Sequence, residues 1–380
     1  MIYKNSKRIK TILLFTLILL QVKCYGQSLF YDNLFIENQH TLSFKLQYSN
    51  KQVKKDTDKK NSIQADLIYG QENNWDTISV HLNARGNFRK ATCYFPPLKM
   101  TIKKSFSKNT IFDGHKKLKL VLPCLLQTRS NDDVLKEYLA YKIYELIATE
   151  HFKTRLATVE YVDTRNVKTE IHPLAVFLPK KIRNTSIYEG EQALASKKPK
   201  TYLLKAIIIE DEKIVAKRNG ANVLKRFVHP LNQAEIPSIT NAFFQFMIGN
   251  TDFSTAYQHN QKLIFKEGKT IPLPYDFDMS GLVNASYAVV SNVQNTTLDI
   301  TNVKERAYRG FERDIKRFQD VRELFLSKQS EILHLFDDYK IHFDETRSFM
   351  EAKAYILSFF AILKNDAKFE SQIVLKARVK

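Results

Sequence analysis

The stretch 131–147, NDDVLKEYLAYKIYELI, separates two differently patterned parts of this 380-residue chain. Its apolar residues follow the spacing i, i+4, i+8, i+11 and i+12, which places them on one helical stripe: Leu135, Leu139, Ile143, Leu146 and Ile147. The polar residues 131–133 at its start supply a cap and acids that suit the positive end of a helix dipole. The stretch therefore predicts one strong helix.

The residues before this helix alternate between apolar and polar as strands do, over roughly 40–125. Two further apolar runs, Leu156–Val162 and Tyr202–Ile209, predict two more strands. From Pro237 onward the apolar spacing becomes helical, interrupted by a short strand at Lys262–Phe265. The expected fold class is α+β and bilobal, with a β-rich N-terminal part containing one main helix and a mostly helical C-terminal part.

The N-terminus has the pattern of a secretory signal. Four basic residues within 4–10 precede the ten apolar residues TILLFTLILL at 11–20, and small or polar residues lead to a cut near Gln27. An uncleaved anchor and lipidation at Cys24 remain alternatives. We expect a signal peptide over 1–27, a β-rich lobe over 28–210 and a mainly helical lobe over 211–380. The protein would then be exported to the periplasm or the outer cell surface, without a transmembrane helix after cleavage.

The composition indicates a globular, basic protein. Hydrophobic residues make up 44% and charged residues 26%, which excludes wholesale disorder and a polytopic membrane protein. The net charge is +19, and residues 1–27 carry five positive charges and no acid, which leaves +14 after cleavage. Such a charge favours an anionic ligand or nucleotide. We also expect an unknown protein or envelope component as acceptor. Export argues against nucleic acid, and scattered lysines also suit an ordinary solvated surface.

Two cysteines remain after cleavage, Cys93 and Cys124. Both lie in or beside predicted strands of the same half, and an oxidising compartment would allow them to pair. Neither has the spacing of a metal ligand.

Two loops place acids directly after apolar elements. FMIGNTD at 246–252 leads to His259 and Asn260, and PLPYDFDMSG at 272–281 contains Asp276 and Asp278. An acid, then Asn, then a second acid after a hairpin is the order that phosphoryl transfer uses. Asp252 would be the catalytic acid, with Mg²⁺ or Mn²⁺ on Asn260 and on either Asp276 or Asp278.

The nucleotide phosphates would be held from the N-terminal part, by Arg85, Lys99 and Glu137. The chain has no Gly-rich phosphate loop. Asp and Asn are also common turn formers, so these acids could be structural. Arg306 and Arg309 precede Gly310 and could line an anion site, or could be surface charges.

Longer strings resemble an uncharacterised family of exported proteins from Bacteroidota. The resemblance covers roughly 75–312. It is carried by RGNFR at 85–89, FPPLK at 95–99, GNTD at 249–252, HN at 259–260 and PYDFD at 274–278. At longer range the order of motifs resembles CotH spore-coat kinases and HipA-type atypical kinases. That resemblance implies an ATP- and metal-dependent kinase fold, with Asp252 catalytic.

One departure from those kinases leaves two functions open. They place Asn five residues after the catalytic Asp, where this chain has Tyr257, whereas Asn260 comes eight residues after it. A longer loop would keep the site active as a phosphotransferase with an unknown acceptor. A missing metal ligand would make the protein a non-catalytic, pseudokinase-like binding or structural protein of the envelope.

Overall fold

A computed structural model describes most of the chain after residue 32. The described ranges are 33–36, 42–58, 60–71, 74–127, 129–164, 199–291 and 298–379. The predicted signal peptide lies outside these ranges.

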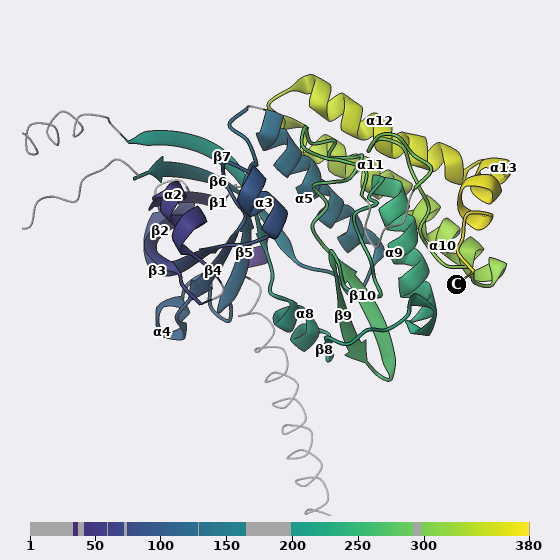
Figure 1. Ribbon diagram of the computed structural model, residues 1–380, viewed down its shortest axis with the longest axis horizontal. Helices are drawn as coiled ribbons and strands as arrows, with labels where there is room; N and C mark the ends of the chain where they lie inside the picture. Colours follow the sequence, from purple (N-terminus) through teal and green to yellow (C-terminus); the bar gives the residue numbers. More distant parts are fainter. Residues whose placement is uncertain are drawn as a thin grey trace, which may run out of the picture.

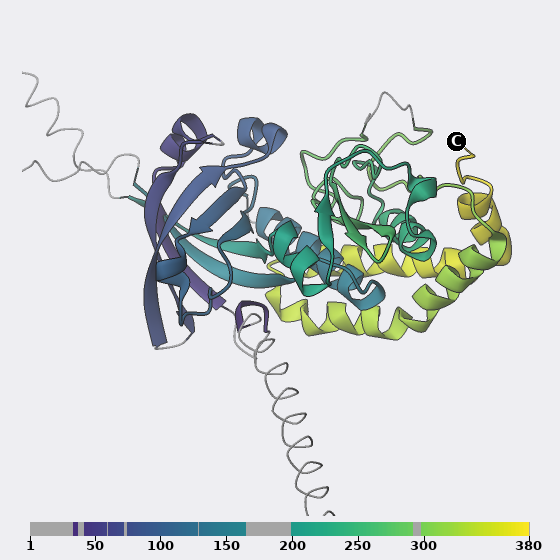
Figure 2. The ribbon, with the colours of Figure 1, turned by 90° about the horizontal axis from the view of Figure 1, so that it is seen from below.

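Seven strands of the N-terminal part close into a β-barrel, in the order β1-β2-β3-β4-β5-β7-β6 (Figures 1 and 2). The closing pair, β1 with β6, is parallel, and the other neighbouring pairs are antiparallel. The strands are β1 (Leu42–Tyr48), β2 (Ile63–Gln71), β3 (Asn74–Ala84), β4 (Leu98–Ile102), β5 (Lys117–Val121), β6 (Thr154–Asp163) and β7 (Lys200–Ile209). The short helix η2 (Asn33–Phe35) precedes β1, and α2 (Asn50–Asp56), α3 (Asn87–Thr92) and α4 (Lys104–Ser107) lie between the strands.

The barrel is filled by the apolar residues that alternate along each strand. In β4, Leu98, Met100 and Ile102 are fully buried, while the intervening Lys99 and Thr101 are partly exposed. The buried set joins equivalent residues of the other strands in one core. The alternation therefore assigns Lys99 to the outer face, where its register partner on β5 is Lys119.

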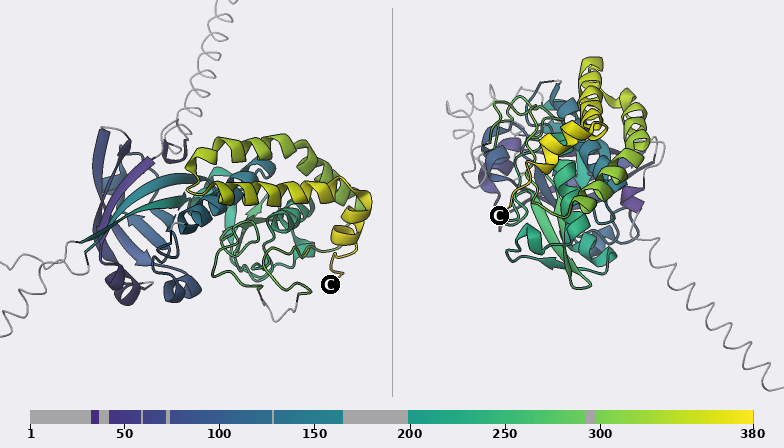
Figure 3. Two further views of the ribbon diagram at one scale, coloured as in Figure 1. Left: turned by 90° about the horizontal axis from the view of Figure 1, so that it is seen from above. Right: turned by 90° about the vertical axis from the view of Figure 1, so that its right-hand side faces the viewer.

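A second core lies beside the barrel. The helix α5 (Arg129–Ile147) packs against β7 and β6 of the barrel and also against α9 (Glu235–Ile248) and the C-terminal helices (Figures 1 and 3). A three-stranded sheet, β10-β9-β8, completes this part. Its strands are β8 (Asn222–Leu224), β9 (Gln261–Lys266) and β10 (Lys269–Pro274). The remaining helices are α8 (Glu212–Arg218), η5 (Pro230–Asn232), α10 (Ile315–Ser327), α11 (Gln329–Asp338), η7 (Lys340–His342), α12 (Thr346–Leu363), α13 (Asp366–Phe369) and η8 (Glu370–Val374).

The α5 helix is buried on most of its surface, and its polar start does not cap it. It begins two residues before the expected cap, at Arg129. Asn131 Oδ1 instead accepts a hydrogen bond from the backbone of Lys205 at 2.9 Å. Asp132 accepts bonds from the backbone N–H groups of Asp344 and Glu345, at 2.8 and 3.0 Å. These polar side chains thus connect α5 to β7 and to the segment before α12.

The predicted bilobal, kinase-like α+β fold class is wrong. The finding that overturns it is the closed barrel, together with a second, three-stranded sheet in the part expected to be mostly helical. Local alternation shows which side chains a strand buries, but it carries no information on which distant strand it pairs with. The pairing of β1 with β6 that closes the barrel joins Leu42 to Ala157 and was therefore invisible in the sequence pattern.

Within the described ranges, no helix has both the length and the apolar character needed to cross a bilayer. The helix α12, for example, has 18 residues but carries Arg347, Glu351 and Lys353. This agrees with the expectation that no helix spans a membrane once the leader is removed.

Cys93 and Cys124 form a disulfide that joins the end of α3 to the segment after β5. We predict that replacing both with Ser lowers the free energy of unfolding by about 3–4 kcal/mol, because the unfolded chain loses a covalent loop of 31 residues. Urea unfolding of both proteins checks this value. Dithiothreitol should destabilise the parent and leave the double variant unchanged; equal effects on both would contradict the prediction.

Candidate functional site

The two acid-bearing loops meet at the same end of the β9–β10 hairpin. Gln261 at the start of β9 lies opposite Pro274 at the end of β10, so the residues just outside them are neighbours. The backbone N–H of Tyr275 donates to the carbonyl oxygen of Asn260 at 3.1 Å. The structure therefore brings Asp252 and Asn260 close to Asp276 and Asp278.

Asp252 is held by three side-chain donors. Its Oδ1 accepts from Ser291 Oγ at 2.8 Å and lies 3.1 Å from His259 Nε2. Its Oδ2 accepts from Asn260 Nδ2 at 2.8 Å, and the same amide also bonds to the carbonyl oxygen of Asp252 at 2.8 Å. Asn260, predicted as a metal ligand, thus directs its amide nitrogen at Asp252.

Charge within this group is set by those contacts. Burial alone would raise the pKa of Asp252, but the bonds from His259 and Ser291 lower it below its ordinary value. The hydrogen bond to Asp252 raises the pKa of His259. Asp276 contributes to the His259 shift, which places the two loops within electrostatic range of each other. At neutral pH the Asp252 carboxylate is therefore ionised.

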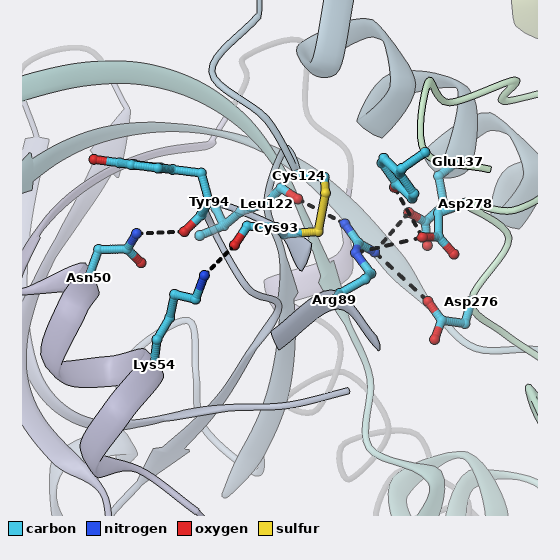
Figure 4. The surroundings of a disulfide bond; sticks show 11 residues. Asn50, Lys54, Arg89, Cys93, Tyr94, Leu122, Cys124, Glu137, Asp276 and Asp278 are labelled. Carbon is cyan, nitrogen blue, oxygen red and sulfur yellow. Dashed lines mark hydrogen bonds and ion pairs between the residues drawn. A yellow bond between two sulfur atoms is a disulfide. The ribbon is translucent and has the colours of Figure 1, made fainter. Parts of the chain in front are cut away.

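The second group is a buried arginine, Arg89, surrounded by three carboxylates (Figure 4). Its Nη1 lies 3.7 Å from Glu137 Oε2 and 3.9 Å from Asp276 Oδ1, and its Nε lies 3.6 Å from Asp278 Oδ2. Its Nη2 donates to the carbonyl oxygen of Leu122 at 3.0 Å. Arg89 comes from α3 on the barrel, Glu137 from α5 and the two Asp residues from the loop after β10, so one side chain joins three parts of the fold.

The arginine is not tightly paired. All three ion-pair distances exceed hydrogen-bond length, and Nε and Nη1 are buried without a hydrogen-bond partner among the described residues. Glu137 Oε1 is likewise buried without a hydrogen-bond partner among the described residues. Burial raises the pKa of Glu137 and of Asp278, although Arg89 opposes both shifts. Asp276 is the acid of this group with the most exposed side chain, 29%, so it is the one that a solute can reach directly.

Sequence reasoning selected Arg85 from the RGNFR motif and missed Arg89. The helix α3 starts after Gly86, whose φ of 74° suits glycine, and the disulfide fixes its last turn. This geometry turns Arg89, four residues after Arg85, toward Glu137. The RGNFR motif contains both arginines, so the sequence offered Arg89 as well. The short helix α3 determines that Arg89, and not Arg85, contacts the acids.

A third group of charges lies on the outer face of the barrel. Lys119 Nζ is 4.5 Å from the centre of the Tyr275 ring and 4.8 Å from that of Phe152. It is 4.0 Å from Glu212 Oε2 and has no hydrogen-bond partner among the described residues. Burial, followed by repulsion from Arg85 and Lys262, lowers the pKa of Lys119 to about 7. Lys262 Nζ lies 5.5 Å from the centre of the same Tyr275 ring.

The structure thus gathers Asp252, Asn260, Asp276, Asp278 and Glu137 around one region. Lys99, the predicted phosphate lysine, is the cross-strand neighbour of Lys119, and it is Lys119 that contacts Tyr275. The signal for Lys119 was its position as a lone lysine in the apolar run at 118–122.

The acids do not form a ready metal cluster. Over the described ranges, no three His, Cys, Asp or Glu side chains are arranged to hold a metal ion. Arg89 faces Glu137 and Asp278, and Tyr287 Oη donates to Asp278 Oδ2 at 3.0 Å. Mg²⁺ needs only one or two carboxylates when it arrives with substrate phosphates, and Asp276 fits that limited role.

A scan against protein-family models gives no match for this chain, and a comparison with curated proteins gives none either.

We predict that Lys119→Met stabilises the protein by about 1–3 kcal/mol at pH 6–7, because a buried charge without a hydrogen bond is costly. In the unfolded chain Lys119 keeps its proton up to its ordinary pKa of 10.5, and in the folded chain only up to about 7. The parent therefore gains stability from this group as pH rises between those values, and the advantage of the variant shrinks toward pH 10.

Urea unfolding between pH 6 and 10 measures this difference. The matched control is Lys117→Met, which removes an exposed lysine from the same strand and should give a difference that does not vary with pH. A Lys119→Met variant that is less stable than the parent at pH 6 would contradict the assignment.

We predict that Gly249→Ala lowers the free energy of unfolding by more than Gly268→Ala. Both glycines have φ above 60°, so each alanine incurs about 1 kcal/mol of backbone strain. At Gly249 the new Cβ would also collide with the hydroxyl of Tyr355, whereas at Gly268 it meets open space. Adding Tyr355→Phe to Gly249→Ala should restore part of the loss, and no restoration would exclude the collision as its cause.

Proposed function

We propose that this protein is an exported phosphotransferase that uses ATP with Mg²⁺ or Mn²⁺, with an acceptor that is unknown. The proposal does not use the kinase-like fold, which the barrel excludes. The observation that carries it is the junction at Tyr275 and Asp276. The buried, unbonded cation of Lys119 lies against the Tyr275 ring, and the partly exposed carboxylate of Asp276 comes next in the chain.

Lys119 and Lys262 would hold the nucleotide phosphates. Both ammonium groups lie over the Tyr275 ring. Burial is the main cause of the lowered pKa of Lys119, and repulsion from Arg85 is the second. Repulsion among cations is stored in the free protein and is relieved when an anion binds between them. A phosphate would also supply the hydrogen-bond acceptor that Lys119 lacks.

Asp276 would hold the divalent cation, and Asp278, which is buried against Arg89 and Tyr287, would orient the loop. When bound with the nucleotide, the cation neutralises charge on the transferring phosphoryl group. Arg89 lies beside Glu137 and Asp278 and opposes the rise that burial causes in the pKa of both carboxyl groups.

Asp252 would position the acceptor hydroxyl. Ser291 Oγ, 2.8 Å from Oδ1, already places one hydroxyl hydrogen bond on this carboxylate, and an incoming hydroxyl could replace it. His259 and Asn260 fix the orientation of the carboxylate and keep it ionised. A proton leaving the acceptor would be taken up at Oδ1 of Asp252, beside His259.

Export is supported by the leader pattern and by the Cys93–Cys124 disulfide, since such bonds persist in oxidising compartments. The resemblance to exported Bacteroidota proteins agrees with a location in the periplasm or on the outer surface.

One observation favours the second candidate, a non-catalytic envelope binding protein. Arg89 already occupies the position that three acids face, and the Asp252 carboxylate is fully bonded. The two experiments below distinguish the candidates.

Thermal unfolding with ATP and Mg²⁺ tests the binding step. A ligand at 100 times its dissociation constant stabilises the folded state by about 2.7 kcal/mol, so the melting temperature of the parent should rise by several degrees. Asp276→Asn should lose the metal-dependent part, and Lys119→Gln should lose most of the shift. The control Lys117→Gln should behave as the parent, and a parent that does not respond would reject an ATP-dependent enzyme.

The second experiment separates binding from chemistry. We predict that Asp252→Asn keeps the nucleotide-induced thermal shift but lowers the turnover of ATP by about 100-fold or more, as expected for loss of a positioned base. Release of labelled phosphate over hours measures the turnover. Equal turnover in Asp252→Asn and the parent would leave the protein as a nucleotide binder and favour the non-catalytic candidate.

A further inference from the structure

A cavity of about 200 Å³ lies beside the loop that carries Asp252. Residues 253–257 form one wall and the first half of α9 forms another, with Asn241 and Ala242. The segment 227–230, residues 309–311 and Arg378 complete it. The C-terminal segment therefore returns to the neighbourhood of α9 and α10 (Figure 1). Among the described residues that line the cavity there is no Asp or Glu.

Two arginines lie together in this cavity. Arg309 is 6% exposed and donates to the carbonyl oxygen of Thr251, and Arg378 donates to the carbonyl oxygen of Arg309. The guanidinium of Arg378 lies 4.1 Å from the centre of the Phe311 ring. Its Nε is buried without a hydrogen-bond partner in the described part of the chain. Two neighbouring guanidinium groups with no carboxylate in the lining make the cavity cationic, and the nearest acid acting on Arg309 is Asp252 in the adjoining loop.

Arg306, which the sequence paired with Arg309, has a different role. It donates to the carbonyl oxygens of Met247 and Tyr355, and its guanidinium stacks 3.9 Å from the centre of the Tyr355 ring. All of its bonding serves to join α9 to α12. Only Arg309 of the pair is available to a ligand in the cavity.

Aromatic side chains also line part of the cavity. Phe227 and Tyr257 meet edge to face with centroids 5.2 Å apart, yet they are 55% and 68% exposed. Phe253 lies 5.3 Å below the guanidinium of Arg309. A cavity of about 150 Å³ can hold one benzene ring, so this one has room for a ring with a charged substituent. Exposed rings beside a buried charge form a site with an apolar wall and a fixed polar end.

We propose that this cavity binds a small organic anion, consisting of a phosphate or carboxylate on a single planar ring. The anionic group would bond to Arg378 Nε and Arg309, and the ring would lie between Phe227, Tyr257 and Phe253. The site is separate from the proposed nucleotide site, and it stands if the phosphotransferase proposal fails. Arg309 contacts the residue before Asp252, so an occupant of the cavity would also hold the Asp252 loop in place.

Titration calorimetry with phenyl phosphate tests the proposal on the intact protein. We expect saturable binding to the parent and a loss of affinity of tenfold or more in Arg378→Gln. The matched control is Lys376→Gln, an exposed lysine two residues earlier, which removes the same charge and should change affinity by less than twofold. Lys119→Gln should bind phenyl phosphate as the parent does, which distinguishes this cavity from the nucleotide site.

A second variant tests the aromatic wall. Tyr257→Ala removes an exposed ring, so we expect it to fold normally and to bind phenyl phosphate at least threefold more weakly, with no change in binding of inorganic phosphate. The proposal is overturned by absence of saturable binding to the parent at about 10 mM phenyl phosphate. It is also overturned by equal losses in Arg378→Gln and Lys376→Gln, or by a loss in Lys119→Gln alone. Should Arg378→Gln not fold, as judged by circular dichroism, unchanged affinity in Tyr257→Ala decides against it.

Discussion

The arrangement of the site depends on the ion pairs between the buried Arg89 and three carboxylates. Arg89 holds together a barrel helix, the central helix α5 and the loop after β10, through Glu137, Asp276 and Asp278. Removing one member of such a set leaves uncompensated charge in a buried environment, which is far more costly than the net gain from forming it. The disulfide at the end of α3 restricts where Arg89 can go. The position of the acids is therefore a property of the whole fold and not of their loop.

The electrostatics divide the region into three parts with different roles. Asp252 is ionised and held by three side-chain donors, Glu137 and Asp278 beside Arg89 are buried and have raised pKa values, and the Lys119 amine is buried and has a lowered pKa. Groups whose environments shift their pKa values in different directions are typical of sites that bind or move charge, although structural networks also produce them. Here the unbonded atoms of Arg89, Glu137 and Lys119 give the region unused bonding capacity.

Much of the local structure could be predicted from the sequence, whereas the long-range pairing could not. Alternation assigned Leu98 and Met100 to the interior and Lys99 to the outside, because side chains in a strand alternate between faces. The apolar stripe predicted α5, whereas the motif order left open whether the loops with Asp252 and Asp276 would meet. Three features depend on residues far apart in the chain. They are the closure of the barrel, the contact of Arg89 rather than Arg85 with the acids, and the contact of Lys119 with Tyr275. No local period reports such contacts.

The parallel pairing that closes the barrel also determines when the chain can fold. Leu42 pairs with Ala157, 115 residues later, so β1 cannot complete its pairing until β6 has been synthesised. The strand β7 then pairs with both β5 and β6. Contacts this distant are slow to form, because the entropy of closing the loop is lost before the pairing compensates for it. During synthesis from the N-terminus, β1 to β5 emerge before the strands that close the barrel, and an open sheet of these strands would have unpaired edges, which favour aggregation. A chaperone that shields β1 until residue 209 has emerged would have a clear physical role for this chain.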